Sequence, residues 1–349
     1  MLIKPKKKKL ITRREFCRVA GMGLAGATLI GCGSDNGSGI FTPGGDKDSV
    51  IDGDMDIENE LEQEFEEALP RKFRVAFLAD THIIDDFYEG PEGSPLDTKT
   101  IFESNDNFMA VRDYINSLDP PIDLVTISGD FIHNYPSKDW DFYMENKTRI
   151  DIAKEIIDGF NMPVHVGLGN HDYDVGDISR EFTQDLFREK LGLERTYYDI
   201  DHRGFKFIML DNFLGSTHDV NSPDYGGELG SFGEEQLNWL DAKLSEGMPS
   251  FVFTHYPLLV LKGKEVGGLG LKSVIKKHED VVQLLIAGHT HLWMDWREIY
   301  KLPHIVLGST RYDRDAYMLL ELDSEDMSFK ILNEDKYGWG TNYSEPFEG

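Results

Sequence analysis

The tetrapeptide Gly169-Asn170-His171-Asp172 places an amide, an imidazole and a carboxylate in succession at the end of an apolar run, residues 164–168. Pro163 and Gly169 bound this run, which is typical of a short buried strand. A turn at the end of that strand can direct the Asn oxygen towards a metal ion while the His side chain faces a substrate. Taken alone, the tetrapeptide is equally typical of an ordinary polar turn, so its interpretation depends on the other strand ends.

Four further apolar runs end in residues of the same types. These residues are Asp80 and His82, then Asp130, then His255, and finally His289 and His291. Because the carboxyl ends of parallel strands share one edge of a sheet, where ligands bind, we expect these side chains to meet in one cleft. Imidazoles and carboxylates without a thiolate favour Zn, Mn or Fe over a thiolate-bound structural zinc.

The elements that must position these residues alternate between strand and helix from residue 73 onwards. Strands are predicted over residues 73–79, 122–128, 164–168, 249–253 and 281–287, with helices over 108–118, 150–157 and 182–191. A hairpin is predicted for 196–210, and closing antiparallel strands for 292–307 and 317–332. Residues 231–234, Ser-Phe-Gly-Glu, are typical of a capping box that opens another helix. This order predicts an α/β fold of two packed mixed sheets flanked by helices, in one domain over residues 73–349.

The five motifs together resemble those of the calcineurin-like metallophosphoesterase family: Asp-x-His, Gly-Asp, Gly-Asn-His-Asp, a lone His and Gly-His-x-His, in that order. The resemblance covers roughly residues 73–310, and its specificity comes from all five motifs occurring in order after apolar runs. It implies a four-layer α/β/β/α metallophosphoesterase sandwich with a dinuclear metal site. The implied cofactors are two transition-metal ions such as Mn, Fe or Zn, either divalent or of mixed valence.

The resemblance also implies seven metal ligands in two sets that share one residue. The first metal is held by Asp80, His82 and His291, the second by Asn170, His255 and His289, and Asp130 bridges both through its two carboxylate oxygens. His171 is implied to be the catalytic group, as a general acid or a donor to a phosphate oxygen, with Asp172 orienting it or a neighbouring turn. His133 and Arg311 are candidate substrate contacts.

Two such ions would generate hydroxide from bound water and clamp an in-line displacement at phosphorus. The implied function is hydrolysis of a small phosphate ester, and of phosphodiesters in particular. The chain departs from purple acid phosphatases, which have Tyr at the position of His133. It also departs from phosphoprotein phosphatases, whose Gly-Asp precedes Val-Asp-Arg-Gly, because residues 131–134 are Phe-Ile-His-Asn. It is most similar to small phosphodiesterases of the cyclic-nucleotide and glycerophosphodiester type.

Two alternatives to a phosphodiesterase stay open. A phosphomonoesterase would use the same site on a more highly charged ester. A metal-binding or ligand-binding lipoprotein without turnover would use the same fold, because a fold alone does not determine function. The intact set of predicted ligands favours an enzyme over the second alternative.

The charge of the chain is strongly acidic and unevenly distributed. The 349 residues include 36 basic and 63 acidic residues, for a net charge of −27, although residues 1–31 hold eight basic residues and one acidic residue. Such an acidic body repels nucleic acid and anionic surfaces, so nucleic acid is not expected as a partner. The positive charge of the predicted metal ions would attract a phosphate ester locally.

Residues 1–32 are typical of an export signal. A basic start precedes Thr12-Arg13-Arg14-Glu15-Phe16, which looks like a twin-arginine motif, and an apolar stretch over residues 19–30 follows. Leu29-Ile30-Gly31-Cys32 resembles a lipobox, in which cleavage before Cys32 leaves a lipid-modified N-terminus. Residues 33–72 are predicted to be a flexible acidic tether. We therefore expect a membrane-anchored lipoprotein facing the periplasm or the cell exterior; a simple signal peptide and a basic disordered tail are the alternatives.

The lipobox predicts that Cys32→Ser releases the protein from membranes and leaves its activity intact. The physical reason is that the tether of residues 33–72 separates the lipid anchor from the predicted metal site. Membrane fractionation of the variant measures this outcome. Continued sedimentation of the variant with membranes would contradict the lipoprotein assignment.

Overall fold

The computed structural model describes residues 2–3, 70–174, 177–226 and 229–334 of the chain. The predicted signal segment and tether lie outside the described residues, except for Leu2–Ile3 and residues 70–72. Leu2–Ile3 form β1, a two-residue strand that pairs antiparallel with β12 (Ser328–Ile331). In the described part of the chain, no helix combines the length and the apolar character needed to cross a bilayer.

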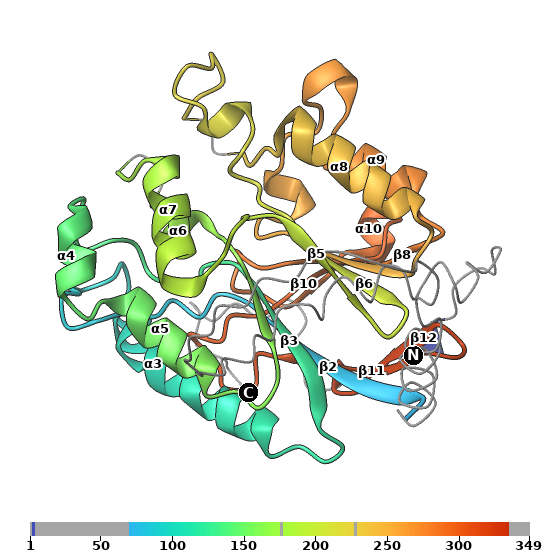
Figure 1. Cartoon of the computed structure of the whole chain (residues 1–349), viewed down its shortest axis with the longest axis horizontal. Coiled ribbons are helices and arrows are strands. Elements are labelled where there is room, and N and C mark those ends of the chain that lie inside the picture. Colours follow the sequence, from blue (N-terminus) through green and yellow to red (C-terminus); the bar gives the residue numbers. More distant parts are fainter. Residues whose placement is uncertain (1, 4–69, 175–176, 227–228, 335–349) are drawn as a thin grey trace, which may run out of the picture. The chain divides into compact units, whose positions relative to one another are not determined.

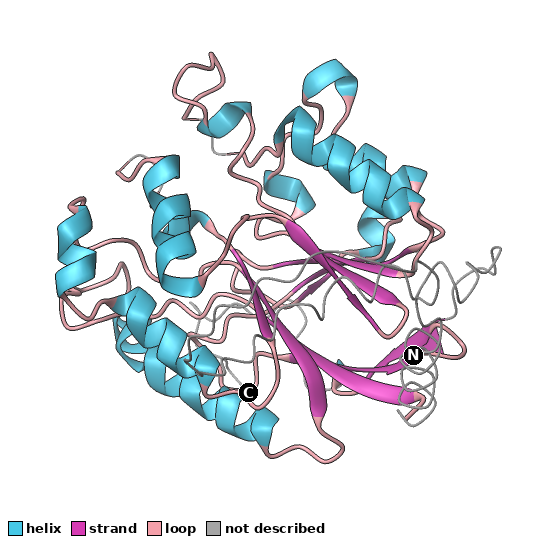
Figure 2. Ribbon diagram, in the orientation of Figure 1, coloured by secondary structure: helices cyan, strands magenta, loops and turns pink. Residues whose placement is uncertain are grey.

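Two six-stranded mixed sheets form the centre of the fold (Figures 1 and 2). The first has the order β1-β12-β11-β2-β3-β4, with the bounds β2 Lys72–Leu78, β3 Ile122–Ser128, β4 Val164–Gly167 and β11 Met318–Asp323. The second has the order β5-β6-β7-β8-β10-β9, with the bounds β5 Tyr198–His202, β6 Phe205–Met209, β7 Ser250–Phe253, β8 Val282–Ala287, β9 Met294–Asp295 and β10 His304–Val306. Parallel strands carry the predicted motifs in both sheets: β2, β3 and β4 in the first, and β7 and β8 in the second.

Helices cover the outer face of each sheet, so the fold has four layers (Figure 1). On one side lie α3 (Pro95–Asn116), α4 (Trp140–Glu145), α5 (Arg149–Asp158), α6 (Asn170–Tyr173) and α7 (Arg180–Leu191). On the other lie α8 (Gly233–Ser245), α9 (Leu271–Lys277) and α10 (Arg297–Tyr300). Short 3₁₀ turns occupy Ser216–His218, Leu258–Val260 and Val266–Gly268. The predicted α/β/β/α sandwich of two mixed sheets flanked by helices is confirmed.

The residues of β2 alternate between two hydrophobic cores. Val75 and Phe77 point into the core between the two sheets, whereas Ala76 and Leu78 belong to the core under the helices. This is the two-residue period of a strand that is buried on both faces. The ring of Phe77 packs on Phe253 of the facing sheet with 4.8 Å between ring centroids. This aromatic layer fixes the spacing of the two sheets, and therefore the distance between the motifs that each sheet carries.

The predicted capping box at residues 231–234 is wrong. The N-cap of α8 is Phe232, which makes no side-chain cap, and the Ser231 hydroxyl instead contacts Thr217. The carboxylate of Glu265 accepts the N–H groups of Phe232 at 3.0 Å and Gly233 at 2.8 Å. An acidic group still stabilises the helix start, but it comes from a distant loop.

The predicted antiparallel strands over residues 292–307 are also partly wrong. Helix α10 separates β9 from β10, and β10 pairs parallel with β8 and antiparallel with β9. A helical crossover allows a strand to return parallel to its neighbour, which the short alternating run did not reveal. Strands β11 and β12 form the expected antiparallel pair.

The core between the sheets generates a stability prediction. Phe77 is fully buried, so Phe77→Ala should leave a cavity and lower the free energy of unfolding by about 3–5 kcal/mol. The matched control is Phe102→Ala on α3, because 56% of Phe102 is exposed and its loss should change that free energy by only about 0.5 kcal/mol. Chemical denaturation of both variants measures the difference, and equal effects would contradict this account of the core.

Candidate metal centre

The predicted ligands all lie just beyond the carboxyl ends of five parallel strands. Each position follows directly from the element that precedes it: Asp80 and His82 follow β2, Asp130 follows β3, Asn170 begins α6 after β4, His255 follows β7, and His289 and His291 follow β8. Because the two sheets pack face to face, these ends converge from both sheets. The seven residues that the sequence predicts as metal ligands therefore form one cluster. Their role as ligands stays a prediction.

An unusual backbone conformation directs five of these seven side chains. The φ angles are positive at Asp80 (55°), His82 (48°), Asp130 (49°), His289 (73°) and His291 (56°). Positive φ is uncommon for residues other than glycine, and it is strained unless the surroundings impose it. Hydrogen bonds between motifs impose it here, for example from the His82 N–H to the Asp130 carbonyl at 2.9 Å. Strain of this kind is typical of functional sites.

Two motif glycines are required because other groups approach them closely. A Cβ atom at Gly129, which has φ of +85°, would lie 2.6 Å from Nδ1 of His255. A Cβ atom at Gly169 would lie 2.2 Å from a carboxylate oxygen of Asp130. Any side chain at these two positions would push the clustered groups apart.

The first predicted ligand set gathers its donor atoms in a small volume. The donor atoms of Asp80, His82, Asp130 and His291 all lie within 4.8 Å of one another. Nε2 of His82 lies 2.9 Å from Nε2 of His291, and Oδ1 of Asp80 lies 3.4 Å from that same His291 atom. Lone pairs that converge in this way fit a cation between them.

The second set converges on the amide oxygen of Asn170. That oxygen lies 3.0 Å from Nε2 of His255 and 2.9 Å from Nδ1 of His289. The other nitrogen of His255, Nδ1, lies 2.9 Å from the Ser128 carbonyl oxygen, which can only accept a hydrogen bond. The Nδ1–H of His255 therefore donates to Ser128, and Nε2 is left to face the cluster.

Asp130 is predicted to belong to both sets, and one of its carboxylate oxygens lies near residues of both. Its Oδ2 lies 3.2 Å from Nε2 of His255 and 3.6 Å from Nε2 of His82. Its Oδ1 instead accepts the backbone N–H of His171 at 2.8 Å. In this structure one oxygen therefore lies between the two sets, and the other fixes the turn of the Asn-His motif. That Asp130 bridges two metal ions stays a prediction.

The buried carboxylate and imidazoles of the cluster shift one another's pKa values. Burial raises the pKa of Asp130, but His255, His171 and His82 together outweigh that effect and hold the pKa of this carboxyl well below its usual range. Burial lowers the pKa of His255, but the Asp130 carboxylate raises it to about 9. Burial and the neighbouring His255 together lower the pKa of His289 to about 3. Without metal, the protonated His255 supplies positive charge next to Asp130, and a bound metal cation would take over that role.

His171 lies beside the cluster but belongs to neither set. Its Nδ1 lies 2.6 Å from Oδ1 of Asn134, and its ring stacks on His133 at 4.5 Å between centroids. Burial lowers the pKa of His171 to about 4, so the ring is neutral at neutral pH. Asp172 does not contact that ring; its carboxylate accepts backbone N–H groups from Gly169 and from residues 131 and 132, and so orients the neighbouring turn.

The two candidate substrate contacts are both buried, and their polar groups contact other parts of the protein. His133 lies with its ring nitrogens next to His82 and Glu92. Arg311 donates from Nη2 to the Asp97 carbonyl of α3 at 2.8 Å, and its guanidinium lies 5.0 Å from the centroid of the Tyr312 ring. Contact of either residue with a substrate stays a prediction.

Three polar residues near the cluster were not singled out from the sequence. Glu92 accepts from His133, Asn134 contacts His171, and Asn212 accepts the backbone N–H groups of His255 and Tyr256. Asn212 had a usable signal, because it follows the apolar run of β6 as the other motifs follow theirs. Glu92 had none, since it lies in a loop ten residues after His82.

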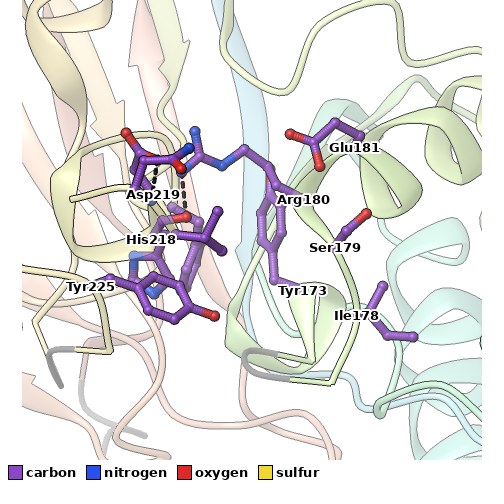
Figure 3. A pocket seen from close by; sticks show the side chains of 11 residues that line it. Tyr173, Ile178, Ser179, Arg180, Glu181, His218, Asp219 and Tyr225 are labelled. Atoms are coloured by element: carbon purple, nitrogen blue, oxygen red, sulfur yellow. Dashed lines mark hydrogen bonds between the residues drawn. The ribbon is translucent and has the colours of Figure 1, made fainter.

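A cavity of about 240 Å³ is lined by Tyr173, residues 178–181, Phe213, residues 218–221 and Tyr225 (Figure 3). Tyr173 and Phe213 form part of its wall, and Arg180 reaches across it from α7 towards Asp219 and His218 (Figure 3). Nη2 of Arg180 donates to the His218 carbonyl at 2.5 Å. The ring of Phe213 packs on Tyr256, whose centroid is 4.3 Å from that of His289. Ring contacts therefore run from Phe213 at the cavity through Tyr256 to His289.

The chain is similar to several known proteins. The model of the calcineurin-like phosphoesterase family matches residues 73–292. A protein of Arcobacter nitrofigilis named "Probable glycerophosphodiester phosphodiesterase GpdQ" is 26% identical over 253 residues, which are 68% of this chain and 83% of that protein. Among solved structures, GAP50, the anchor in the inner membrane complex of Plasmodium, has a TM-score of 0.43 and 17% identity, over 72% of this chain and 81% of that one. Purple acid phosphatase PPD1 from yellow lupin (Lupinus luteus) seeds has a TM-score of 0.44 and 14% identity, over 76% of this chain and 54% of that one.

The shared position of Asp130 predicts a difference between two variants in metal content. Asp130→Ala should lose the metal of both sets, because it removes the one oxygen that lies between them. His171→Ala should retain metal, because its ring belongs to neither set. Elemental analysis of the purified variants measures both outcomes. Loss of metal from His171→Ala would show that its assigned role is wrong.

Proposed function

Because the chain belongs to the calcineurin-like phosphoesterase family and is a phosphoester hydrolase, we propose that it uses two metal ions to hydrolyse phosphodiesters. The observation that carries the proposal is the pair of donor sets that meet at Oδ2 of Asp130. The first ion would be held by Asp80, His82 and His291, and the second by Asn170, His255 and His289. The name of the relative from Arcobacter nitrofigilis supports a diester as substrate.

Transition-metal ions bound in the two sets would supply Lewis acidity for a water molecule and for a phosphate oxygen. The residues of this chain then position the ester and its proton. His171 holds a proton at Nδ1 against Oδ1 of Asn134, which leaves Nε2 to exchange a proton with the substrate. A phosphate anion beside the ring would raise the pKa of His171, so that Nε2 could take a proton from solvent and give it to the leaving oxygen.

The charge of the site favours a diester over a monoester. Two divalent ions carry four positive charges, and Asp80 and Asp130 are the only acidic residues among the seven ligands. Deprotonation of the attacking water lowers the remainder to about one positive charge, which matches a singly charged diester. No Lys or Arg side chain of the described residues forms a hydrogen bond or an ion pair with the seven ligands, and Arg311 is held by Asp97. A dianionic monoester therefore lacks a matching cation.

The cavity lined by Tyr173 and Phe213 supports a place for the organic part of the ester. The ring of Tyr173 and the buried ring of Phe213 offer apolar surface, and Arg180, Ser179 and Asn221 offer polar groups around it. An aromatic wall with a few polar groups is the usual composition of a small-molecule site. The substrate is therefore proposed to be a small phosphate ester rather than a polymer.

The proposed location of the enzyme is outside the cytoplasm, held at a membrane. It would leave the cell by the twin-arginine route and be anchored through a lipid on Cys32. The sequence of residues 1–32 supports this proposal, as does the acidic tether that would hold the enzyme away from the lipid surface. The twin-arginine route exports folded proteins, which suits an enzyme that receives its metal before export.

The charge argument predicts that kcat/KM for bis(p-nitrophenyl) phosphate exceeds kcat/KM for p-nitrophenyl phosphate, on one preparation loaded with Mn²⁺. His171→Ala should lower turnover of the diester by about 10²–10⁴, the usual effect of losing a positioned acid. Release of p-nitrophenol measures all three values. A clear preference for the monoester would refute the charge argument and favour the phosphomonoesterase alternative. Absence of hydrolysis of either ester by the metal-loaded wild type would favour the non-catalytic lipoprotein.

A further inference from the structure

A line of hydrogen bonds runs from the metal cluster to the loop after β2. Nδ1 of His82 lies 3.1 Å from Nδ1 of His133, and Nε2 of His133 lies 2.9 Å from Oε1 of Glu92. The Tyr88 hydroxyl donates to the same Glu92 oxygen at 2.5 Å. His82 and His133 are both buried, at 0% and 4% exposure. The loop that carries Tyr88 and Glu92 is thus connected to a predicted metal ligand.

The position of each proton in this line follows from the geometry. Nε2 of His82 faces the cluster, so it must be free of a proton to bind metal, and the proton of the neutral ring is then on Nδ1. Nδ1 of His133 must then accept the hydrogen bond from Nδ1–H of His82, so the ring proton of His133 is on Nε2. The Nε2–H of His133 donates to Glu92. The hydrogen bond from His133 holds the pKa of Glu92 at about 2, so this side chain is a carboxylate that can accept.

The same histidines could instead be considered a separate metal site, because ring nitrogens of His82, His133 and His171 lie within 4.8 Å of one another. The orientation of the rings argues against it. The rings of His133 and His171 are stacked with 21° between their planes, so their in-plane lone pairs do not point at a common centre. Nε2 of His133 and Nδ1 of His171 also have other partners, in Glu92 and Asn134.

A buried ion pair holds the two loops of this line together. Arg149 of α5 pairs with Asp85, with 2.8 Å between Nη2 and Oδ1, and its Nη1 donates to the backbone carbonyls of His133 and Asn134. The Asp85 carboxylate also accepts the backbone N–H of Arg149. This pairing fixes the loop after β2 against the loop after β3. His133 is therefore held in place by the backbone as well as by its own ring nitrogens.

We propose that Glu92 and His133 are positioning residues that fix the tautomer and the ring orientation of His82, and that they thereby set the affinity of the first metal set. The inference rests on the proposed two-metal site and adds two residues that act on it from outside. Partners of this kind on a metal-binding His change metal affinity by about 10–100-fold when they are removed. His133 thus has a role that does not require contact with the substrate.

The test is calorimetric titration of Mn²⁺ into the metal-free full chain and its variants. His133→Leu removes the acceptor for His82 and should weaken binding of one of two Mn²⁺ ions by about 10–100-fold. His133→Asn places an amide oxygen near the position of Nδ1, so it should restore most of that affinity. Glu92→Gln keeps the shape but removes the charge, and should weaken the same ion by about tenfold. Glu89→Gln is the matched control on the same loop, with an exposed carboxylate, and should change nothing.

The comparison between Leu and Asn at position 133 separates an effect of the lost hydrogen bond from an effect of poorer packing. Leu packs better than Asn in a buried site but cannot accept a hydrogen bond from His82. Equal affinities of His133→Leu and wild type, or equal losses in His133→Leu and His133→Asn, would overturn the proposal. If His133→Leu does not fold, the Mn²⁺ affinities of Glu92→Gln and Glu89→Gln are compared instead. Equal affinities of these two variants would overturn the proposal. Three Mn²⁺ ions bound to the wild type would favour the separate histidine site and overturn it. A wild type that binds no Mn²⁺ would overturn the proposed function and this inference together.

Discussion

The architecture of the site depends on one buried carboxylate. Asp130 is 1% exposed, and its Oδ2 lies between Nε2 atoms of His82 and His255, which belong to the first and the second sheet. A buried charge is costly unless polar or positive partners surround it, so this carboxylate is stable only because both sheets present such groups at the same point. The packing of the two sheets and the chemistry of the site are therefore coupled at this residue.

That coupling requires a fixed separation between the sheets. Each donor set combines residues from both of them: Asp80 and His82 with His291, and Asn170 with His255 and His289. The aromatic layer around Phe77 sets the spacing, because rings packed at the density of a protein interior resist compression and sliding. Local strain then directs the side chains, since most of the ligand positions have positive φ. The cost of that strain is offset by hydrogen bonds between motifs and, in the proposed enzyme, by the metal.

The surroundings of the cluster divide into two parts. On one side, His171 contacts Asn134, and ring contacts lead from Tyr256 to the cavity of Tyr173 and Phe213. The cavity of about 240 Å³ lies on this side. On the other side, His133, Glu92 and the pair of Arg149 with Asp85 have defined partners, and a second cavity, of about 260 Å³, is lined in part by His133, Glu92 and Arg149. The hydrogen bonds on this side hold the ring of His133 in place beside His82.

The sequence by itself determined the strands that carry the motifs and the residues that gather at their ends. Apolar runs such as residues 122–128 predict buried strands, and a side chain that can bind metal, such as Asp130 or His255, follows the end of each run. The meeting of these residues followed from a general property of α/β sheets, whose strand ends share an edge. Local patterns were sufficient because each motif is encoded by neighbouring residues.

Only the tertiary structure decided which atoms face one another. Four contacts join residues that are distant in the sequence. They are the approach of one Asp130 oxygen to His255, the contact of Glu92 with His133, the cap that Glu265 gives to α8 and the parallel pairing of β10. Such contacts leave no periodic signal, because an exposed-looking Glu in a loop has the same local pattern whether it meets solvent or a buried imidazole. Their partners are set by the packing of loops on a completed fold, which is a property of the whole chain.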